Sequence, residues 1–385
     1  MELRVERDAL ADAVGWTARS LPARPPMQVL LGLLLEVGGL SAPDGLAVSA
    51  FDYEVSSRIE LPATSDEPGR VLVPGRLLAD IVRSLPAQPV ELRLEGARVV
   101  LTCGTARFTL PTLPVEDYPD LPDMPSTTGA LESDVFAAAV AQVALAAGRD
   151  DTLPVLTGVR IEIEGEQLTL AATDRYRLAV RTLTWRPESP GLSATALVPA
   201  RTLADTAKAL TGGAEVTLAL STGSAGDGMI GFEGGPAGSA RRTTSRLLEG
   251  EFPKYRSLLP SESSATAEVP TAHLVEAVKR VALVAARNAP VRLGFSADGL
   301  VLEAGGADDA QASERLECSW EGSEPLQIAF NPAYLLDGLA AVDSDATTLS
   351  FTGPTRPAVL TGKRADGPAA SADYRYLLMP VRLSG

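Results

Sequence analysis

The sequence predicts an α+β fold of three similar domains, each with two helices packed against antiparallel sheets. Three observations lead to this prediction. One pattern recurs three times along the 385 residues, apolar residues follow helical spacing at two places in every copy, and period-two alternation separates those places. Pro74, Pro199 and Pro332 mark equivalent points of the copies, at intervals of domain length and far longer than a solenoid unit.

A first helix opens each copy of the repeat. Leu10 and Val14 show its apolar spacing in the first copy, and the same spacing recurs in the other two. The predicted helices cover residues 6–19, 132–149 and 270–287. Residue types that cap helices stand near their starts, namely Asp8, Ser133 and Thr271.

A second helix and several strands complete each copy. The second helix begins near the three equivalent prolines, because a proline in the first turn lacks only an N–H that has no helical partner. We expect these helices at residues 75–86, 199–210 and 331–341. Val90, Leu92 and Leu94 alternate with charged residues, as in a half-buried strand. Further strands are expected at residues 108–110, 159–163, 168–172 and 300–303.

Two proline-rich connectors separate the copies. Residues 113–122 and 251–260 resemble each other and have the composition of loops. They predict domains at residues 1–125, 126–259 and 260–385.

The composition offers few groups for catalysis or metal binding. Cys103 and Cys318 lie far apart without neighbouring ligand residues, which indicates two free buried thiols and no zinc site. His273 is the only histidine, and we expect it to be solvated in a first helical turn. We therefore expect no catalytic residue, no metal and no cofactor. A hydrolase or transferase is the less favoured alternative, because the sequence has no phosphate-binding loop either.

Hydropathy argues against membrane insertion. No stretch approaches the roughly 18 apolar residues of a membrane span, and the mixed charges of the N-terminus are unlike a secretion signal. We expect a cytoplasmic protein with no membrane partner.

Six motifs stand in order along the repeat. They are LPARP at 21–25, GRDDTLP at 148–154, ATDRYRLAV at 172–180, FPKY at 252–255, FNPAY at 330–334 and YLLMPVRL at 376–383. Together they resemble the bacterial DNA polymerase III beta subunit family, the DNA sliding clamps, over essentially the whole chain. The resemblance implies three clamp domains per chain and a head-to-tail homodimer that closes a ring around double-stranded DNA.

The resemblance also implies what this ring does. It would tether a polymerase without bond-making chemistry and would be nucleoid-associated in the cytoplasm. Its implied partners are itself, duplex DNA held without sequence preference, the DNA polymerase III alpha subunit, the clamp loader, and other polymerases and repair proteins that carry short linear motifs. A cyclic-peptide inhibitor is a further implied ligand.

Basic residues toward the ends of the predicted helices are the candidates for facing DNA. As a set they could attract phosphates without reading bases, although cations also favour helix C-termini for reasons of the helix dipole alone. The expected DNA-facing residues are Arg24, Arg83, Arg149, Arg201, Lys208, Lys279 and Arg280.

A peptide-binding groove between the second and third domains is the second implied site. The positions that match the family are Leu156, Thr173, Arg175, Tyr176, Arg177, Leu178, Pro253, Leu258, Leu377, Leu378, Met379, Pro380, Val381, Arg382 and Leu383. Apolar walls with a few polar groups suit a peptide groove. The alternative is that leucines such as Leu156, Leu178 and Leu377 are ordinary core residues of strands.

Two groove positions depart from the family pattern. Family members usually carry a small residue at position 175 and often His at 176, whereas this chain has Arg175 and Tyr176. The departures leave open whether this is a housekeeping clamp or a diverged second copy that tolerates a groove-binding inhibitor. A protein-only scaffold that has lost DNA encirclement is a separate alternative.

The net charge of −15 at first argues against a DNA partner, since phosphates repel acidic surfaces. The six predicted helices, however, carry a summed formal charge of +1, which leaves −16 for the rest of the chain. An acidic exterior would repel DNA from outside a ring and leave its helix-lined hole as the favourable place.

Overall fold

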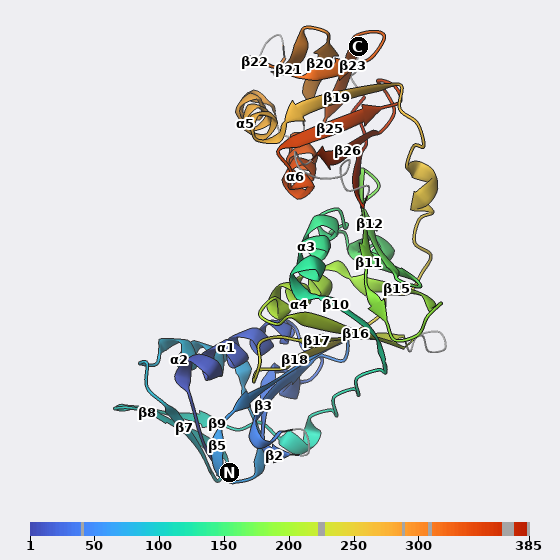
Figure 1. The fold of residues 1–385 in the computed structure, drawn as a ribbon. Helices are drawn as coiled ribbons and strands as arrows, with labels where there is room; N and C mark the ends of the chain where they lie inside the picture. Colours follow the sequence, from blue (N-terminus) through green and yellow to red (C-terminus); the bar gives the residue numbers. More distant parts are fainter. Residues whose placement is uncertain (40–41, 222–227, 287–288, 307–309, 364–372, 383–385) are drawn as a thin grey trace. The chain divides into compact units, whose positions relative to one another are not determined.

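The computed structural model describes the chain except for residues 40–41, 222–227, 287–288, 307–309, 364–372 and 383–385 (Figure 1). The chain forms two compact units. Unit 1 contains residues 1–137, 185–192 and 201–247, and unit 2 contains residues 138–184, 193–200 and 248–385.

The six expected helices are confirmed. They are α1 (Arg7–Thr17), α2 (Gly75–Ser84), α3 (Ser133–Ala144), α4 (Ala200–Leu210), α5 (Thr271–Val281) and α6 (Pro332–Val342). Short 3₁₀ turns follow two of them and occur in four connections: η1 (Ala18–Ser20), η2 (Gln28–Leu31), η3 (Val115–Asp117), η4 (Pro154–Thr157), η5 (Tyr255–Leu258) and η6 (Ala282–Val284).

The first helix of each copy ends earlier than predicted. α3 stops at Ala144, so Arg149 lies in the following loop. The apolar pattern runs past the helix because Ala146 and Ala147 are buried from that loop. In the third copy the first helix was predicted to reach Arg287, which lies outside the described part of the chain.

The predicted caps are wrong. Asp8 pairs with Arg7 (2.6 Å), the Ser133 hydroxyl donates to the Gly213 carbonyl, and Thr271 bonds to the Thr347 hydroxyl (2.8 Å). Asp8 thus pairs with its neighbour in the same helix, while Ser133 and Thr271 bond to a loop and a strand that lie beside the helix start.

The start of α6 combines the expected helix-start signals, whereas the described N-caps of α1, α2 and α5 have no side-chain cap bond. The Asn331 side chain accepts from the backbone N–H of Ala333 (2.9 Å) and Tyr334 (3.3 Å), and Pro332 is the first helical residue. Pro74 instead forms the N-cap of α2, and Pro199 precedes α4.

Unit 1 contains two antiparallel sheets. One has the order β5 (Thr64–Glu67), β1 (Glu2–Val5), β7 (Val90–Glu95), β8 (Arg98–Cys103) and β9 (Ala106–Pro111). The other has the order β14 (Arg186–Pro187), β10 (Thr127–Glu132), β16 (Glu215–Ser221), β17 (Met229–Gly234), β18 (Arg241–Arg246), β4 (Val55–Pro62), β3 (Ala42–Phe51), β2 (Gly32–Gly39) and β6 (Gly69–Pro74).

Unit 2 has the corresponding pair. Its larger sheet has the order β15 (Ser193–Pro199), β11 (Gly158–Glu164), β12 (Gln167–Thr173), β13 (Arg177–Thr184), β27 (Tyr374–Leu378), β26 (Ala358–Lys363), β25 (Ala346–Phe351), β19 (Ala265–Pro270) and β23 (Ser319–Glu321). Its smaller sheet has the order β22 (Ala312–Leu316), β21 (Gly299–Ala304), β20 (Val291–Ser296) and β24 (Leu326–Phe330).

Each nine-stranded sheet crosses a boundary between copies of the repeat. In unit 1, β18 of the second copy pairs antiparallel with β4 of the first, and in unit 2, β27 of the third copy pairs with β13 of the second. The middle copy therefore divides its strands between both units, which explains why compactness yields two units where the repeat has three copies.

The cores lie between helices and sheets. In the first copy Leu10 and Val14 of α1 and Leu78 and Val82 of α2 are buried against the strands, as the helical spacing predicts. In unit 2, Leu178 and Leu377 pack with Phe252 of the second connector. That connector is thereby fixed to the sheet.

The thiols and the histidine follow the sequence prediction with one exception. Cys103 is free and buried, while Cys318 is free but only half-buried, so the expectation of two buried thiols is wrong for Cys318. His273 is exposed in the first turn of α5. Among the described residues no helix is long and apolar enough to cross a bilayer, and no cluster of His, Cys, Asp and Glu could hold a metal.

Candidate functional site

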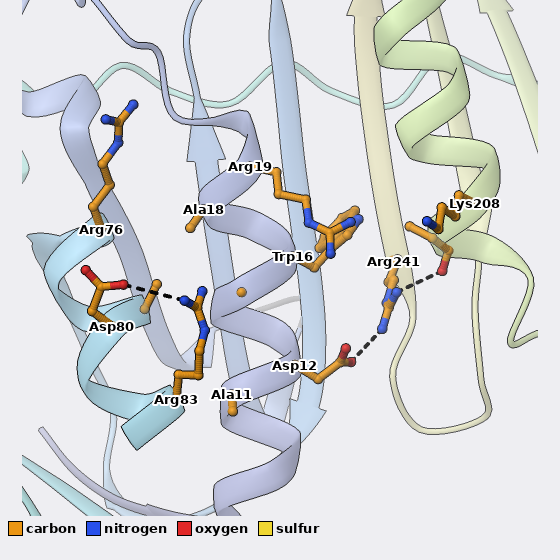
Figure 2. Close-up of a pocket in the computed structure, with 13 residues that line it drawn as sticks. Ala11, Asp12, Trp16, Ala18, Arg19, Arg76, Asp80, Arg83, Lys208 and Arg241 are labelled. Atoms are coloured by element: carbon orange, nitrogen blue, oxygen red, sulfur yellow. Dashed lines mark hydrogen bonds and ion pairs between the residues drawn. The ribbon is translucent and has the colours of Figure 1, made fainter. Parts of the chain in front are cut away.

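A basic helix surface forms the first candidate site. In unit 1 a cavity of about 620 Å³ lies between α1, α2 and the end of α4 (Figure 2). Small residues such as Gly15 and Ala79 line it together with five basic residues: Arg19, Arg76, Arg83, Lys208 and Arg241. An adjoining cavity of about 410 Å³ shares Arg19 and Arg76 and adds Arg201. The structure thus brings together three of the predicted DNA-facing residues, Arg83, Arg201 and Lys208.

Most of these cations are not neutralised by an acidic side chain. Arg83 lies 3.7 Å from Asp80 in a fully solvated pair, which contributes little. Arg19, Arg201 and Lys208 form no ion pair with any described residue. Arg24 is exposed in the loop after η1 and lines neither cavity. Arg19 is one of the basic residues at predicted helix ends that the sequence offers as candidates, whereas Arg76, in the first turn of α2, gave no such signal.

Arg241 of β18 links the helices that form this surface. Its side chain is only 11% exposed and donates to Asp12 of α1 (2.5 Å) and to the carbonyl of Ala209 in α4 (2.8 Å). The guanidinium also lies over the ring of Trp16, 5.5 Å from its centroid (Figure 2). One side chain therefore fixes the helices of the first and second copies relative to each other.

The basic residues predicted on the third copy are paired. Arg280 makes two hydrogen bonds to Glu314 of β22 (2.6 and 3.0 Å), and Lys279 pairs with Glu276 (2.9 Å). Hydrogen bonds from Arg280 hold the pKa of Glu314 below its usual value. Both cations are partly neutralised within the chain and would attract phosphates less than those of the first copy.

A groove cavity of about 720 Å³ in unit 2 is the second candidate site. It contains four of the predicted groove residues, Leu156, Arg175, Tyr176 and Arg177. Arg149, which we expected to face DNA, also lines this cavity, because α3 ends before residue 149 and the following loop lies beside the β12–β13 turn. Its contact with DNA stays a prediction.

Arg177 lies at the inner end of this groove cavity. It is buried and pairs with Asp174 (3.0 Å) and with Asp337 of α6 (2.5 Å), and Tyr334 of α6 covers its guanidinium at 4.4 Å. Burial opposes the charge, yet hydrogen bonds to Tyr376 and Asp337 raise the pKa of Arg177 above its ordinary value. The third copy therefore supplies part of a wall whose other part belongs to the second.

Tyr334 and Asp337 were not among the predicted groove residues. Both follow from α6, whose start contains the FNPAY motif, so a signal was present for Tyr334. Nothing local to Asp337 identifies it as the partner of a cation on β13.

The turn between β12 and β13 forms one rim of the groove. Asp174 Oδ1 accepts from the N–H of Tyr176 and of Arg177 (both 3.0 Å), and the Thr173 hydroxyl donates to the Arg177 carbonyl (2.6 Å). Arg175 has φ +79°, a backbone conformation that favours glycine. Tyr176 projects outward, 55% exposed, and stacks on Tyr334 with ring centroids 6.2 Å apart.

The remaining predicted groove residues divide between core and surface. Leu178 (1% exposed) and Leu377 (2%) are core residues, as the alternative for leucines held, while Leu156 lines the groove cavity. Thr173 and Leu378 are buried as well. The surface group contains Pro253, Leu258, Met379, Pro380, Val381 and Arg382, outside the cavity lining. Leu383 lies beyond the described residues.

The end of the chain is nevertheless attached to the groove rim. The N–H of Met379 donates to the Tyr176 carbonyl (2.9 Å), and the N–H of Val381 donates to the Ala329 carbonyl (2.8 Å). Met379 is exposed beside the turn that carries Arg175. These bonds make the C-terminal residues an extension of the groove surface.

Comparison with known proteins gives matches along the whole chain. Residues 1–122, 130–254 and 256–382 match the N-terminal, central and C-terminal domains of the DNA polymerase III beta subunit. The chain is 61% identical to the beta sliding clamp of Streptomyces coelicolor, with full coverage of both chains. It is 46% identical to the beta sliding clamp homolog GriR of Streptomyces muensis, with 99% of each covered.

Solved structures agree with the sequence matches. The Bacillus subtilis DNA polymerase sliding clamp superposes with a TM-score of 0.88 at 25% identity, covering both chains fully. A Pseudomonas aeruginosa sliding clamp bound to griselimycin gives a TM-score of 0.87 at 27% identity, again with full coverage of both.

Proposed function

The chain belongs to the DNA polymerase III beta subunit family, and from this premise we propose that it is a DNA sliding clamp that works as a ring-shaped homodimer. It encircles duplex DNA, tethers the replicative polymerase and repair factors, and has no catalytic site of its own. We assign its three clamp domains to residues 1–125, 126–259 and 260–385, and its location to the nucleoid in the cytoplasm.

Strand order supports closure of the ring. By position in the repeat, β9 of the first copy corresponds to β18 and β27, and β22 of the third copy corresponds to β4 and β13. The pairs β18–β4 and β27–β13 join neighbouring copies, while β9 and β22 are edge strands of the smaller sheets. Pairing β9 of one protomer with β22 of the next would repeat the same joint and remove both exposed edges.

The helix surface supports sequence-independent DNA binding. Arg19, Arg76, Arg83, Arg201 and Lys208 lie together on helices with small residues between them, which suits a phosphate backbone. The described lining contains no Asn or Gln that could read bases, and its aromatic residue, Trp16, lies under the guanidinium of Arg241. Weak contacts of this kind permit sliding, and topology retains the DNA.

The groove cavity supports capture of short linear motifs. Apolar and aromatic side chains line it together with six charged residues, so a peptide could place both apolar anchors and polar groups here. We infer that the polymerase alpha subunit, the clamp loader and repair proteins insert such motifs here. A related clamp was solved with griselimycin bound, and we infer that a cyclic-peptide inhibitor would occupy the same groove.

Retention on circular DNA tests the main proposal. The dimer is loaded on a nicked circle by a clamp loader, and complexes are isolated by gel filtration. We expect the clamp to stay bound at high salt until the circle is linearised. A dimer that leaves an uncut circle would contradict encirclement and would support the protein-only scaffold.

The groove assignment has its own test. Deleting residues 379–385 removes the bond from Met379 to Tyr176 and the exposed end of the groove surface. We expect binding of a polymerase-derived peptide to be lost while the dimer persists in light scattering. Unchanged peptide affinity would show that the assignment is wrong.

Two of the relatives help to judge the alternative that this chain is a diverged second clamp. Identity is higher to the Streptomyces coelicolor clamp than to GriR, which favours a general clamp. Griselimycin affinity, measured against the other clamp of the same cell if one exists, would decide between them.

A further inference from the structure

Two exposed arginines at the mouth of the groove cavity have no ion-pair partner among the described residues. Arg149 follows α3, and Arg175 lies in the β12–β13 turn. Both line the same cavity. A cation without a partner at the entrance of a binding site is available to a ligand of opposite charge.

The acidic residues of the groove cavity are largely committed elsewhere. Asp174 and Asp337 both pair with the buried Arg177. Asp150 Oδ1 accepts from the backbone N–H (3.0 Å) and the hydroxyl (2.7 Å) of Thr152. These bonds, together with the nearby charge of Arg175, lower the pKa of Asp150. Because Asp174 and Asp337 share one arginine, the lining as a whole holds three arginines and three aspartates and is formally neutral. Its positive charge without an ion-pair partner belongs to Arg149 and Arg175.

The backbone conformation of Arg175 is a property of the repeat and not of the side chain. Tyr53 occupies the equivalent turn between β3 and β4 with φ +74°, and Asp52 caps that turn as Asp174 caps this one. The first central residue of such a hairpin is usually glycine. These two copies differ in the side chain displayed there: the first displays Tyr53, and the second displays a cation that lines a cavity.

Apolar groups lie beside these cations. Leu153 and Leu156 line the same groove cavity, and Tyr176 and Tyr334 form a stacked aromatic wall. A peptide that buries apolar anchors against this wall would bring its neighbouring side chains to the mouth.

We propose that the groove prefers peptides that carry an acidic side chain beside their apolar anchors, with Arg149 and Arg175 as the specificity-determining residues. This inference rests on the proposed peptide-binding function of the groove. Because both arginines are solvated, each contact is modest, and we expect a preference of roughly 3–10-fold.

A peptide series tests this inference. Fluorescent decapeptides share one Leu-Phe anchor pair and carry a single Asp at successive positions, each matched by an Asn version. Affinities are measured by anisotropy with the full-length dimer at low and high salt. We expect an Asp preference at one or two positions that shrinks at high salt, and that falls below about twofold in Arg175→Gly and Arg149→Gln. Arg175→Lys should retain part of it.

Tyr53→Gly is the matched control. It makes the same backbone change in the equivalent turn of the first copy and should leave the Asp preference intact. Melting temperatures of both glycine variants at or above wild type would show that lost preference does not reflect unfolding. Equal affinity for Asp and Asn peptides at every position would overturn the inference. Failure of all peptides to bind the wild type would instead overturn the proposed groove function.

Discussion

Arg177 shows how one residue can join two copies of the repeat. Its guanidinium pairs with Asp174 beside it on the chain and with Asp337 of α6, under the ring of Tyr334. The planar, forked guanidinium can meet these partners together, whereas an ammonium group cannot. A buried cation of this kind is costly to desolvate, so its value lies in fixing positions more than in stability.

Replacing Arg177 by Gln should destabilise the fold and weaken the groove. The change leaves the mostly buried Asp174 without its cation and removes the support of Tyr334, at a cost of about 2–4 kcal/mol. Urea unfolding measures the cost, and peptide binding should weaken in parallel. Arg181→Gln, on the same strand, serves as a comparison. Unfolding free energy within about 0.5 kcal/mol of wild type would contradict the role assigned to Arg177.

At the scale of elements, the connector after the second copy is fixed by one carboxylate. Glu162 of β11 accepts from Tyr255 (2.8 Å) and Arg256 (2.6 Å) of η5 and from Arg160 (2.6 Å). Burial opposes its ionisation, but the hydrogen bonds from Arg256, Tyr255 and Arg160 hold the pKa of Glu162 below its usual value. Burial and the bond to Glu162 also raise the pKa of Tyr255 to about 12.

Glu162 should make the free energy of unfolding depend on pH. Because the pKa of Glu162 is lower in the folded state, its contribution is present above the unfolded value of about 4.3 and is lost as pH falls through the folded one. Glu162→Gln should cost about 1–3 kcal/mol at pH 7, and the difference from wild type should narrow below about pH 4. Thermal unfolding at several pH values measures it. The exposed Glu164→Gln is the control, and a difference that stays constant with pH would contradict the assignment.

Elements also show how far the sequence predicts this fold. Helical spacing and alternation located all six described helices and the predicted strands, since buried faces repeat at fixed intervals. The C-terminal boundary of α3 was predicted too late because Ala146 and Ala147 extend the apolar pattern, although they are buried from a loop. The groove was less predictable. Asp337 meets Arg177 only through pairing of β13 with β27, and no local pattern encodes such a partner.

At the scale of the whole molecule, β9 and β22 remain as edge strands of the smaller sheets, because the equivalent strands of the other copies pair with each other. Leu283 in η6 is 84% exposed, the highest value among the large apolar residues that the structure describes as exposed. It follows α5, the helix that packs on the sheet ending at β22. A solvated leucine beside an edge strand is typical of a surface that another chain covers.

Leu283→Asp should therefore shift the dimer to monomers. A charge placed in an apolar contact costs roughly 2 kcal/mol or more, enough to weaken association at least about 30-fold. Light scattering across a dilution series measures the shift. Val135→Asp, at an exposed apolar position of α3, should leave the dimer unaffected. If Leu283→Asp remains dimeric at the lowest concentrations, this residue lies outside the interface.

The joint between β4 and β18 has a consequence for synthesis of the chain. On the ribosome, β4 is complete once Pro62 has emerged, but its partner begins only at Arg241. At ordinary translation rates the interval is roughly 10–40 s, during which a bare strand edge is presented to other nascent chains. Ser56, Ser57 and Arg58 occupy the first half of β4, and we expect this polar stretch to limit aggregation before β18 is synthesised. Fragments that end before β18 should keep that edge permanently and be difficult to recover from cells.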